Sequence, residues 1–142
     1  MAHTVNSILI NASYDKVFDM SNDISRWKEF FEEYKESDII EKTGNKLVFK
    51  LTNENGNSWQ SYRLLFKEDK MAYASRIEPM FPFEYMKIIW LYREIDEAVE
   101  MTWIQDFKMD SKAKFTDEQV EDLINEHSRV NLQRFKKIIE KE

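Results

Sequence analysis

The sequence predicts an α+β domain in which an antiparallel sheet of about seven strands curves around one long C-terminal helix. Between positions 37 and 109, apolar and polar residues alternate in short runs separated by turn residues. This pattern is typical of antiparallel strands, because neighbouring residues of a strand face opposite sides of the sheet. Beyond position 116, apolar residues recur every three or four positions, which is the period of a helix. A chain of 142 residues fits a single domain spanning positions 1–142.

The first third of the chain predicts one strand and two short helices. Residues 2–11 alternate in character and are rich in β-branched residues, which indicates a strand. Ser13 is suitably placed to cap a short helix over 14–20. A second helix is expected from Asn22 or Asp23. Its apolar positions follow at spacings of three and four and are expected to form one helical stripe: Ile24, Trp27, Phe30, Phe31 and Tyr34.

The middle of the chain predicts six further strands. They are expected over 37–42, 47–52, 59–67, 71–78, 84–95 and 99–109. Gly44 and Gly56 each lie in a tight turn between two runs, and an Asn-Gly pair is a strong hairpin signal. The links are too short for crossover connections, so the strands are expected to be mostly antiparallel.

The last segment predicts a long amphipathic helix that ends near Lys141. Thr116 and Gln119 have the spacing of a capping box at its start. The residues expected on its sheet-facing side are Val120, Leu123, Ile124, His127, Val130, Asn131, Phe135 and Ile138. We expect this helix to cover one face of the sheet, while the two short helices close an internal pocket. The aromatic stripe would then lie at the pocket mouth, either as a hydrophobic plug or as a ligand gate.

A candidate site follows from the alternation of the strand around position 63. Arg63 shares one face of this strand with Trp59 and Ser61. If that face is interior, the neighbouring strands contribute Met86, Ile88, Trp90, Met101, Trp103 and Gln105. A solid core rarely accepts an arginine, a glutamine and a serine together without partners. The alternative is the opposite parity, with Arg63 facing water.

Composition argues against several other functions. The formal charge of −6 disfavours nucleic acid as a partner. Only two histidines, His3 and His127, are present and lie far apart, so no metal site is expected and each is expected to be structural. The absence of cysteine fits a reducing cytoplasm. No segment approaches the roughly 20 apolar residues that span a bilayer, so we expect a cytoplasmic protein without a membrane partner.

Several motifs together resemble the single-domain polyketide aromatase/cyclases. They are Asn6-Ser7-Ile8, Asn22-Asp23-Ile24 with Trp27, Phe31 and Tyr34, Pro82-Phe83-Glu84-Tyr85-Met86, Trp90-Leu91-Tyr92-Arg93, Glu100-Met101-Thr102-Trp103-Ile104-Gln105 and Lys136-Lys137-Ile138-Ile139-Glu140. The resemblance covers nearly the whole chain. It implies a helix-grip fold of the START or Bet v 1-like superfamily, in a monomer or homodimer.

The resemblance also implies a reaction and its partners. The family binds a linear poly-β-ketone carried on an acyl carrier protein of a minimal polyketide synthase. It directs an aldol closure and a dehydration that make the first aromatic ring, and no metal or organic cofactor is implied.

The resemblance further implies which residues act. Arg63 would stabilise a ketone oxygen as an enolate, and Tyr34 would relay protons with Gln105 and water. The residues implied in substrate binding are Trp27, Phe31, Trp59, Ser61, Arg76, Phe83, Met86, Trp90, Trp103, Gln105 and Asn131. Asn57 departs from the family, which has a tryptophan on that strand face, and this bears on the regiochemistry.

Two other functions fit the same fold. A noncatalytic carrier of a lipid or aromatic small molecule would use Arg63 only to pair with an acidic ligand. A partner-binding regulator of the stress-protein or toxin type would retain no small molecule.

Overall fold

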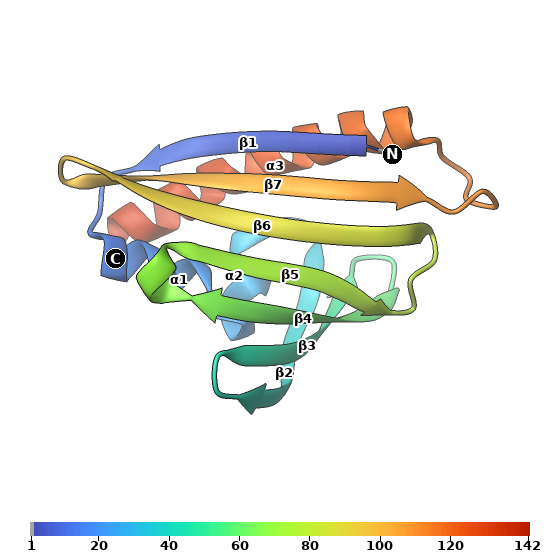
Figure 1. Cartoon of the computed structure of the whole chain (residues 1–142), viewed down its shortest axis with the longest axis horizontal. Helices are drawn as coiled ribbons and strands as arrows, with labels where there is room; N and C mark the ends of the chain where they lie inside the picture. The colour runs from blue at the N-terminus through green and yellow to red at the C-terminus, as the bar shows by residue number, and fades with distance from the viewer. Residues whose placement is uncertain (1) are drawn as a thin grey trace.

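Seven antiparallel strands form one curved sheet in the computed structural model, which describes residues 2–142 (Figure 1). The strands are β1 (Ala2–Ile10), β2 (Tyr34–Thr43), β3 (Lys46–Asn53), β4 (Ser58–Phe66), β5 (Met71–Glu78), β6 (Phe83–Ile95) and β7 (Ala98–Met109). The helices are α1 (Tyr14–Ser21), α2 (Trp27–Phe30) and α3 (Asp117–Lys141), with 3-10 turns at Ile24–Arg26 and Lys67–Asp69. The helix-grip architecture is therefore confirmed.

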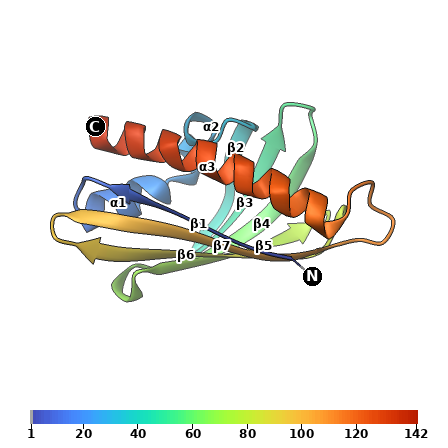
Figure 2. The same ribbon diagram turned by 90° about the horizontal axis from the view of Figure 1, so that it is seen from above.

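The sheet order β1-β7-β6-β5-β4-β3-β2 places the first two strands at opposite edges. The chain between them, which includes α1 and α2, crosses one end of the sheet. Figure 2 shows α3 across the face toward which the sheet curves, with α1 and α2 near its C-terminal end. An ion pair of 2.7 Å between Arg26 Nη2 and Glu142 Oε2 joins this crossing segment to the end of α3. The interior is thus enclosed by the sheet, α3 and the short helices.

The aromatic stripe is not one helix, so this expectation was wrong. α2 ends at Phe30, and Phe31 has an extended backbone with φ −101° and ψ 124°. Tyr34 already begins β2, three residues before the strand was expected. Arg134 of α3 stabilises this early end, because its guanidinium donates to the carbonyl oxygens of Glu29 (2.6 Å) and Phe30 (3.0 Å). The turn after α2 therefore brings Phe31 and Tyr34 to the pocket.

The face that α3 buries differs in part from the expected one. The Thr116 capping box is present, but Leu123 and Val130 are exposed. The buried residues are Val120, Ser128, Asn131, Leu132, Phe135 and Ile139. The contact with the sheet therefore follows a row of residues about four apart and is turned slightly from the expected stripe.

Candidate active site

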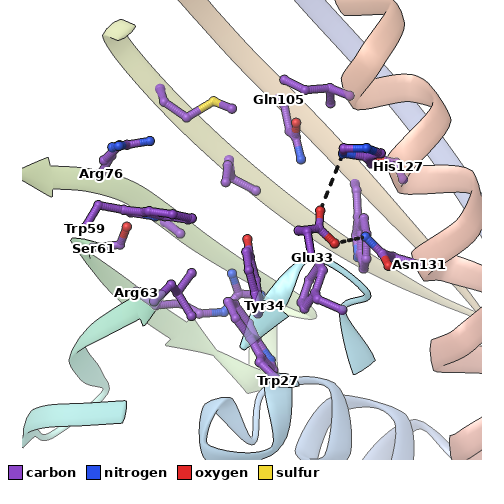
Figure 3. A pocket seen from close by; sticks show the side chains of 18 of the residues that line it. Trp27, Glu33, Tyr34, Trp59, Ser61, Arg63, Arg76, Gln105, His127 and Asn131 are labelled. Carbon is purple, nitrogen blue, oxygen red and sulfur yellow. Dashed lines mark hydrogen bonds and ion pairs between the residues drawn. The ribbon is translucent and has the colours of Figure 1, made fainter. Parts of the chain in front are cut away.

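A cavity of about 250 Å³ lies between the inner face of the sheet, α3 and the turn after α2 (Figure 3). All 13 residues singled out from the sequence as catalytic or substrate-binding line it: Trp27, Phe31, Tyr34, Trp59, Ser61, Arg63, Arg76, Phe83, Met86, Trp90, Trp103, Gln105 and Asn131. The structure therefore gathers the candidate residues in one place, while their roles remain predictions.

The interior parity of β4 is confirmed. Arg63 is 1% exposed and Ser61 is also buried. On β5, Arg63 is opposite Ala74 and Ser61 is opposite Arg76. Met101, which alternation also placed inside, is buried in the core and does not line the cavity.

Small residues on β5 leave room for the cavity. Ala74 lines it and lies between Arg63 of β4 and Ile88 of β6 in the sheet register. Ala72, next on the same face, is opposite Trp90. Because alanine projects only a methyl group, the long side chains of the flanking strands can spread over β5 without filling the space above it.

Stacked aromatic rings form one wall of the cavity. Trp90 and Trp103 are register partners on β6 and β7, and their ring centroids are 4.5 Å apart at an interplanar angle of 14°. Phe31 stacks on Trp103 with centroids 5.5 Å apart, and Trp27 stacks on Trp90 at 5.7 Å. Such a wall is flat and apolar, so it suits a planar, unsaturated ligand.

Arg63 is a buried cation that has no carboxylate partner in the described part of the chain. Its Nε donates to Asn22 Oδ1 at 2.8 Å, and the groups that raise its pKa are the tyrosines Tyr92 and Tyr34. Its Nη2 is buried and lacks a hydrogen-bond partner within residues 2–142. Burial lowers the pKa of Arg63 to about 10, so the side chain stays protonated near neutral pH. A buried, unused donor of this kind is typical of a site that receives an electron-rich ligand atom.

Arg76 lies nearer the mouth and braces the loop between β5 and β6. Its Nε donates to the Pro79 carbonyl oxygen at 2.7 Å, and its Nη2 donates to that of Phe81 at 3.3 Å. The guanidinium carbon is 4.8 Å from the Trp59 ring centroid and 5.4 Å from that of Phe83. Burial lowers the pKa of Arg76. Most of its contacts are therefore with the protein.

Tyr34 and Gln105 offer polar atoms to the cavity. Desolvation is the main cause that raises the pKa of Tyr34, and the nearby Glu33 raises it further. The phenol therefore stays protonated and can donate a hydrogen bond. Gln105 Oε1 is buried and finds no donor in the part of the chain that the structure describes. The Tyr34 hydroxyl can therefore donate to a bound ligand, and Gln105 Oε1 is an acceptor that the fold leaves unpaired.

Two ionisable lining residues, Glu33 and His127, were not predicted as site residues from the sequence. Asn131 Nδ2 donates to Glu33 Oε1 at 2.8 Å, and His127 Nδ1 lies 3.7 Å from Glu33 Oε2 (Figure 3). His127, expected to be structural, instead lines the cavity with 47% of its side chain exposed. The signal in the sequence was its position one helical turn before Asn131, on the same face of α3.

Asn57, which differs from the family residue, does not lie on the strand face where it was expected. Asn57 precedes β4 in the turn after β3, is exposed, and donates its backbone N–H to Asn53 Oδ1 at 3.0 Å. It does not line the cavity, so it does not widen it.

Neither a metal cluster nor a membrane span is found in residues 2–142. No three His, Asp or Glu side chains there gather as metal ligands would. No helix there is long and apolar enough to cross a bilayer.

A sheet wrapped around a long helix, with an enclosed pocket between them, defines a ligand-binding domain of the helix-grip class. The chain belongs to the family "Polyketide cyclase / dehydrase and lipid transport", whose model matches residues 1–140. A relative from Streptomyces cyaneus is 40% identical over 92% of this chain and 88% of its own length. One from Streptomyces halstedii is 38% identical over 72% and 97%, respectively. Both carry the name "Putative polyketide cyclase".

Solved structures agree on the fold. The Zhui aromatase/cyclase from Streptomyces sp. R1128 superimposes with a TM-score of 0.87 at 18% identity, over 97% of this chain and 93% of that one. A START superfamily protein from Mycobacterium smegmatis gives a TM-score of 0.81 at 11% identity, over 99% of both chains.

Proposed function

We propose that this protein is a polyketide aromatase/cyclase. It binds a linear poly-β-ketone tethered to an acyl carrier protein, directs the aldol closure of the first ring, and promotes the dehydration that makes this ring aromatic. Family membership and the names of the two Streptomyces relatives support the class of reaction. The observation that carries the proposal is Arg63, a buried cation with an unused donor in an aromatic cavity.

Arg63 would act on the ketone oxygen. Its free Nη2 donates a hydrogen bond to one carbonyl oxygen, and this bond strengthens as the carbonyl becomes an enolate. Arginine suits this role because it stays protonated and has donors in a fixed plane. The low dielectric of the buried site strengthens the interaction with developing negative charge. No metal or organic cofactor is needed for this step.

The aromatic wall would set the shape of the chain. A poly-β-ketone is flexible and can close many rings, so selectivity requires that the reacting carbons be held together. The stacked rings of Phe31, Trp90 and Trp103 restrict the chain to a flat layer. Tyr34 and Gln105 supply one donor and one acceptor that fix its register. The volume of about 250 Å³ lies near the lower end of small-molecule sites, which suits the folded reacting segment rather than a long chain.

The test reconstitutes the reaction with a minimal polyketide synthase and compares products by liquid chromatography and mass spectrometry. We expect the wild type to replace spontaneous shunt products with one aromatic pattern. The Arg63→Met variant should lose this effect by about 100-fold or more in the rate of directed cyclisation. Arg93→Met, an exposed arginine on β6, is the matched control and should behave as the wild type.

Identical products with and without the wild-type protein would contradict the cyclase. If the protein then still bound a poly-β-ketone mimic in an Arg63-dependent manner, the noncatalytic carrier would be the better description.

A further inference from the structure

We propose that Glu33 and His127 form the proton-transfer site of the cyclisation, an inference that rests on the cyclase function proposed above. The pair would take the proton from the carbon between two ketones and return it to the hydroxyl that leaves. Arg63 stabilises charge but cannot perform this step, because a protonated guanidinium has no lone pair to accept a proton.

The other ionisable groups of the cavity do not fit the role. Five lining residues can ionise: Glu33, Tyr34, Arg63, Arg76 and His127. The two arginines are permanent donors near neutral pH. Tyr34 is a phenol kept protonated by its surroundings. Of these five ionisable residues, Glu33 and His127 are therefore the two whose side-chain chemistry suits them to accept a proton.

The geometry of the pair fits proton transfer. Glu33 Oε1 is held by Asn131 Nδ2 at 2.8 Å, and the Asn131 side chain is itself fixed because its Oδ1 accepts from the Glu32 backbone N–H at 3.0 Å. Glu33 Oε2 is left facing His127 Nδ1 at 3.7 Å. This separation exceeds a direct hydrogen bond, so each group keeps the capacity to contact a substrate or a water that lies beside the pair. Asn131 is thus a positioning residue for Glu33.

The location of the pair also fits. Figure 3 shows Glu33, His127 and Asn131 on the α3 side of the cavity, with Arg63 and Ser61 on the opposite side. A poly-β-ketone that spans the cavity can therefore place one ketone oxygen at Arg63 and a CH₂ group of the same chain at the pair. The side chains of Glu33 and His127 are 32% and 47% exposed, so a proton taken from the substrate can also exchange with solvent.

The steps balance without an additional reactant. The pair removes a proton from the CH₂ group between two carbonyls, and the resulting enolate carbon attacks a ketone carbon further along the chain. One C–C bond forms, one C=O π bond opens, and its oxygen takes the first proton back from the pair to become a hydroxyl. The pair then removes a second proton from the same carbon and donates it to the hydroxyl, which leaves as water while a C=C bond forms.

The experiment separates proton removal from ring closure. Acetylacetone, a 1,3-diketone too short to close a ring, is incubated with the protein in D₂O, and exchange of its CH₂ protons is followed by NMR above the protein-free rate. The variants are Glu33→Gln, His127→Asn and the double variant, each also assayed with the minimal synthase. Glu126→Gln and His3→Asn remove the same groups from exposed positions outside the cavity and serve as controls. Circular dichroism establishes that each variant folds, and Glu33→Ala, which also removes the carboxylate, replaces Glu33→Gln if the latter does not.

We expect each single variant to lower the catalysed exchange by about 100-fold and the controls to leave it unchanged. The double variant should lose little more than either single variant, because the two residues act as one unit. If both single variants keep an exchange rate within about threefold of the wild type and the same product pattern, the proton-transfer role of Glu33 and His127 is wrong. If the fold-loss in the double variant equals the product of the two single losses, the residues act independently and not as one unit.

The two proposals fail separately. If directed cyclisation depends on Arg63 but not on Glu33 or His127, the proton-transfer proposal is wrong and the cyclase proposal stands. If proton exchange depends on the pair but the protein does not redirect the polyketide, the cyclase proposal is wrong and the pair is still a site of proton transfer.

Discussion

The guanidinium carbon of Arg63 lies 4.0 Å from the centroid of the Trp90 ring, so a buried cation rests on an aromatic face rather than against a carboxylate. Trp27 lies on the same cation at 5.3 Å. Cation–π contacts offset part of the desolvation of a charge without occupying its hydrogen-bond donors, and Nη2 of Arg63 has no partner in residues 2–142. The arrangement leaves Arg63 charged and able to bind a ligand, but it lowers the free energy of unfolding.

Replacing Arg63 should therefore stabilise the protein. A pKa of about 10 in place of 12.5 corresponds to about 3 kcal/mol of destabilisation of the buried cation. Arg63→Met keeps a long apolar side chain, and its main cost is the lost hydrogen bond to Asn22. We expect the free energy of unfolding, measured with urea, to rise by about 1–2 kcal/mol. A decrease of 2 kcal/mol or more would mean that Arg63 mainly holds the structure together.

Filling the space above β5 should block the cavity. Ala74→Leu places three more carbon atoms between Arg63 and Ile88, where the wild type is hollow. We expect the affinity for an apolar fluorescent dye, measured by titration, to fall about tenfold. The free energy of unfolding should change by less than about 1 kcal/mol, since the added group enters empty space. Ala98→Leu, in the β6–β7 hairpin, is the control, and an equal loss there would refute a cavity-specific effect.

Tyr34 should contribute to the loss of stability at alkaline pH. Its pKa is raised in the folded protein from an ordinary value of 10.0, so folding favours the protonated phenol. The resulting stability is complete below pH 10 and is lost as the pH rises above it. We expect urea unfolding of Tyr34→Phe to show a shallower decline between about pH 9 and pH 11 than the wild type. Parallel curves would mean that Tyr34 ionises normally and competes with Glu33 and His127 for the proton-transfer role.

Arg134 should stabilise the turn that delivers Phe31 and Tyr34 to the cavity. Arg134→Ala removes the two donors to the carbonyl oxygens of Glu29 and Phe30, and we expect a loss of about 1–2 kcal/mol in the free energy of unfolding. Arg129→Ala, at an exposed position of α3, is the control. Equal stability of the two variants would show that packing alone ends α2 at Phe30.

The strand pattern predicted the interior of the sheet well for a physical reason. A strand has a strict period of two, so once Arg63 is interior, the side on which Trp59 and Ser61 lie follows directly. Turn residues such as Gly44 and Gly56 further limit where strands end, and both have positive φ in the structure.

The helical segments were less well predicted, because tertiary contacts decide their ends and faces. The spacing of Phe31 and Tyr34 continues that of α2, and the contacts of Arg134, more than 100 residues later, lie where the helix stops. The pairing of Glu33 with His127 likewise joins the turn before β2 to the middle of α3. The local periodicity of a sequence contains no information on contacts between segments that are distant in the chain.

The pairing of β1 with β7 has a consequence for how the protein folds during synthesis. Ile10 pairs with Val99 and Ala2 with Phe107, so 89 to 105 positions of a 142-residue chain separate the partners. The first strand made must therefore wait, unpaired, until the seventh strand has left the ribosome. Contacts this distant in sequence slow folding because a long loop has to close first. We expect β1 to join the sheet late, and the nascent chain to expose its strand edge to chaperones for most of translation.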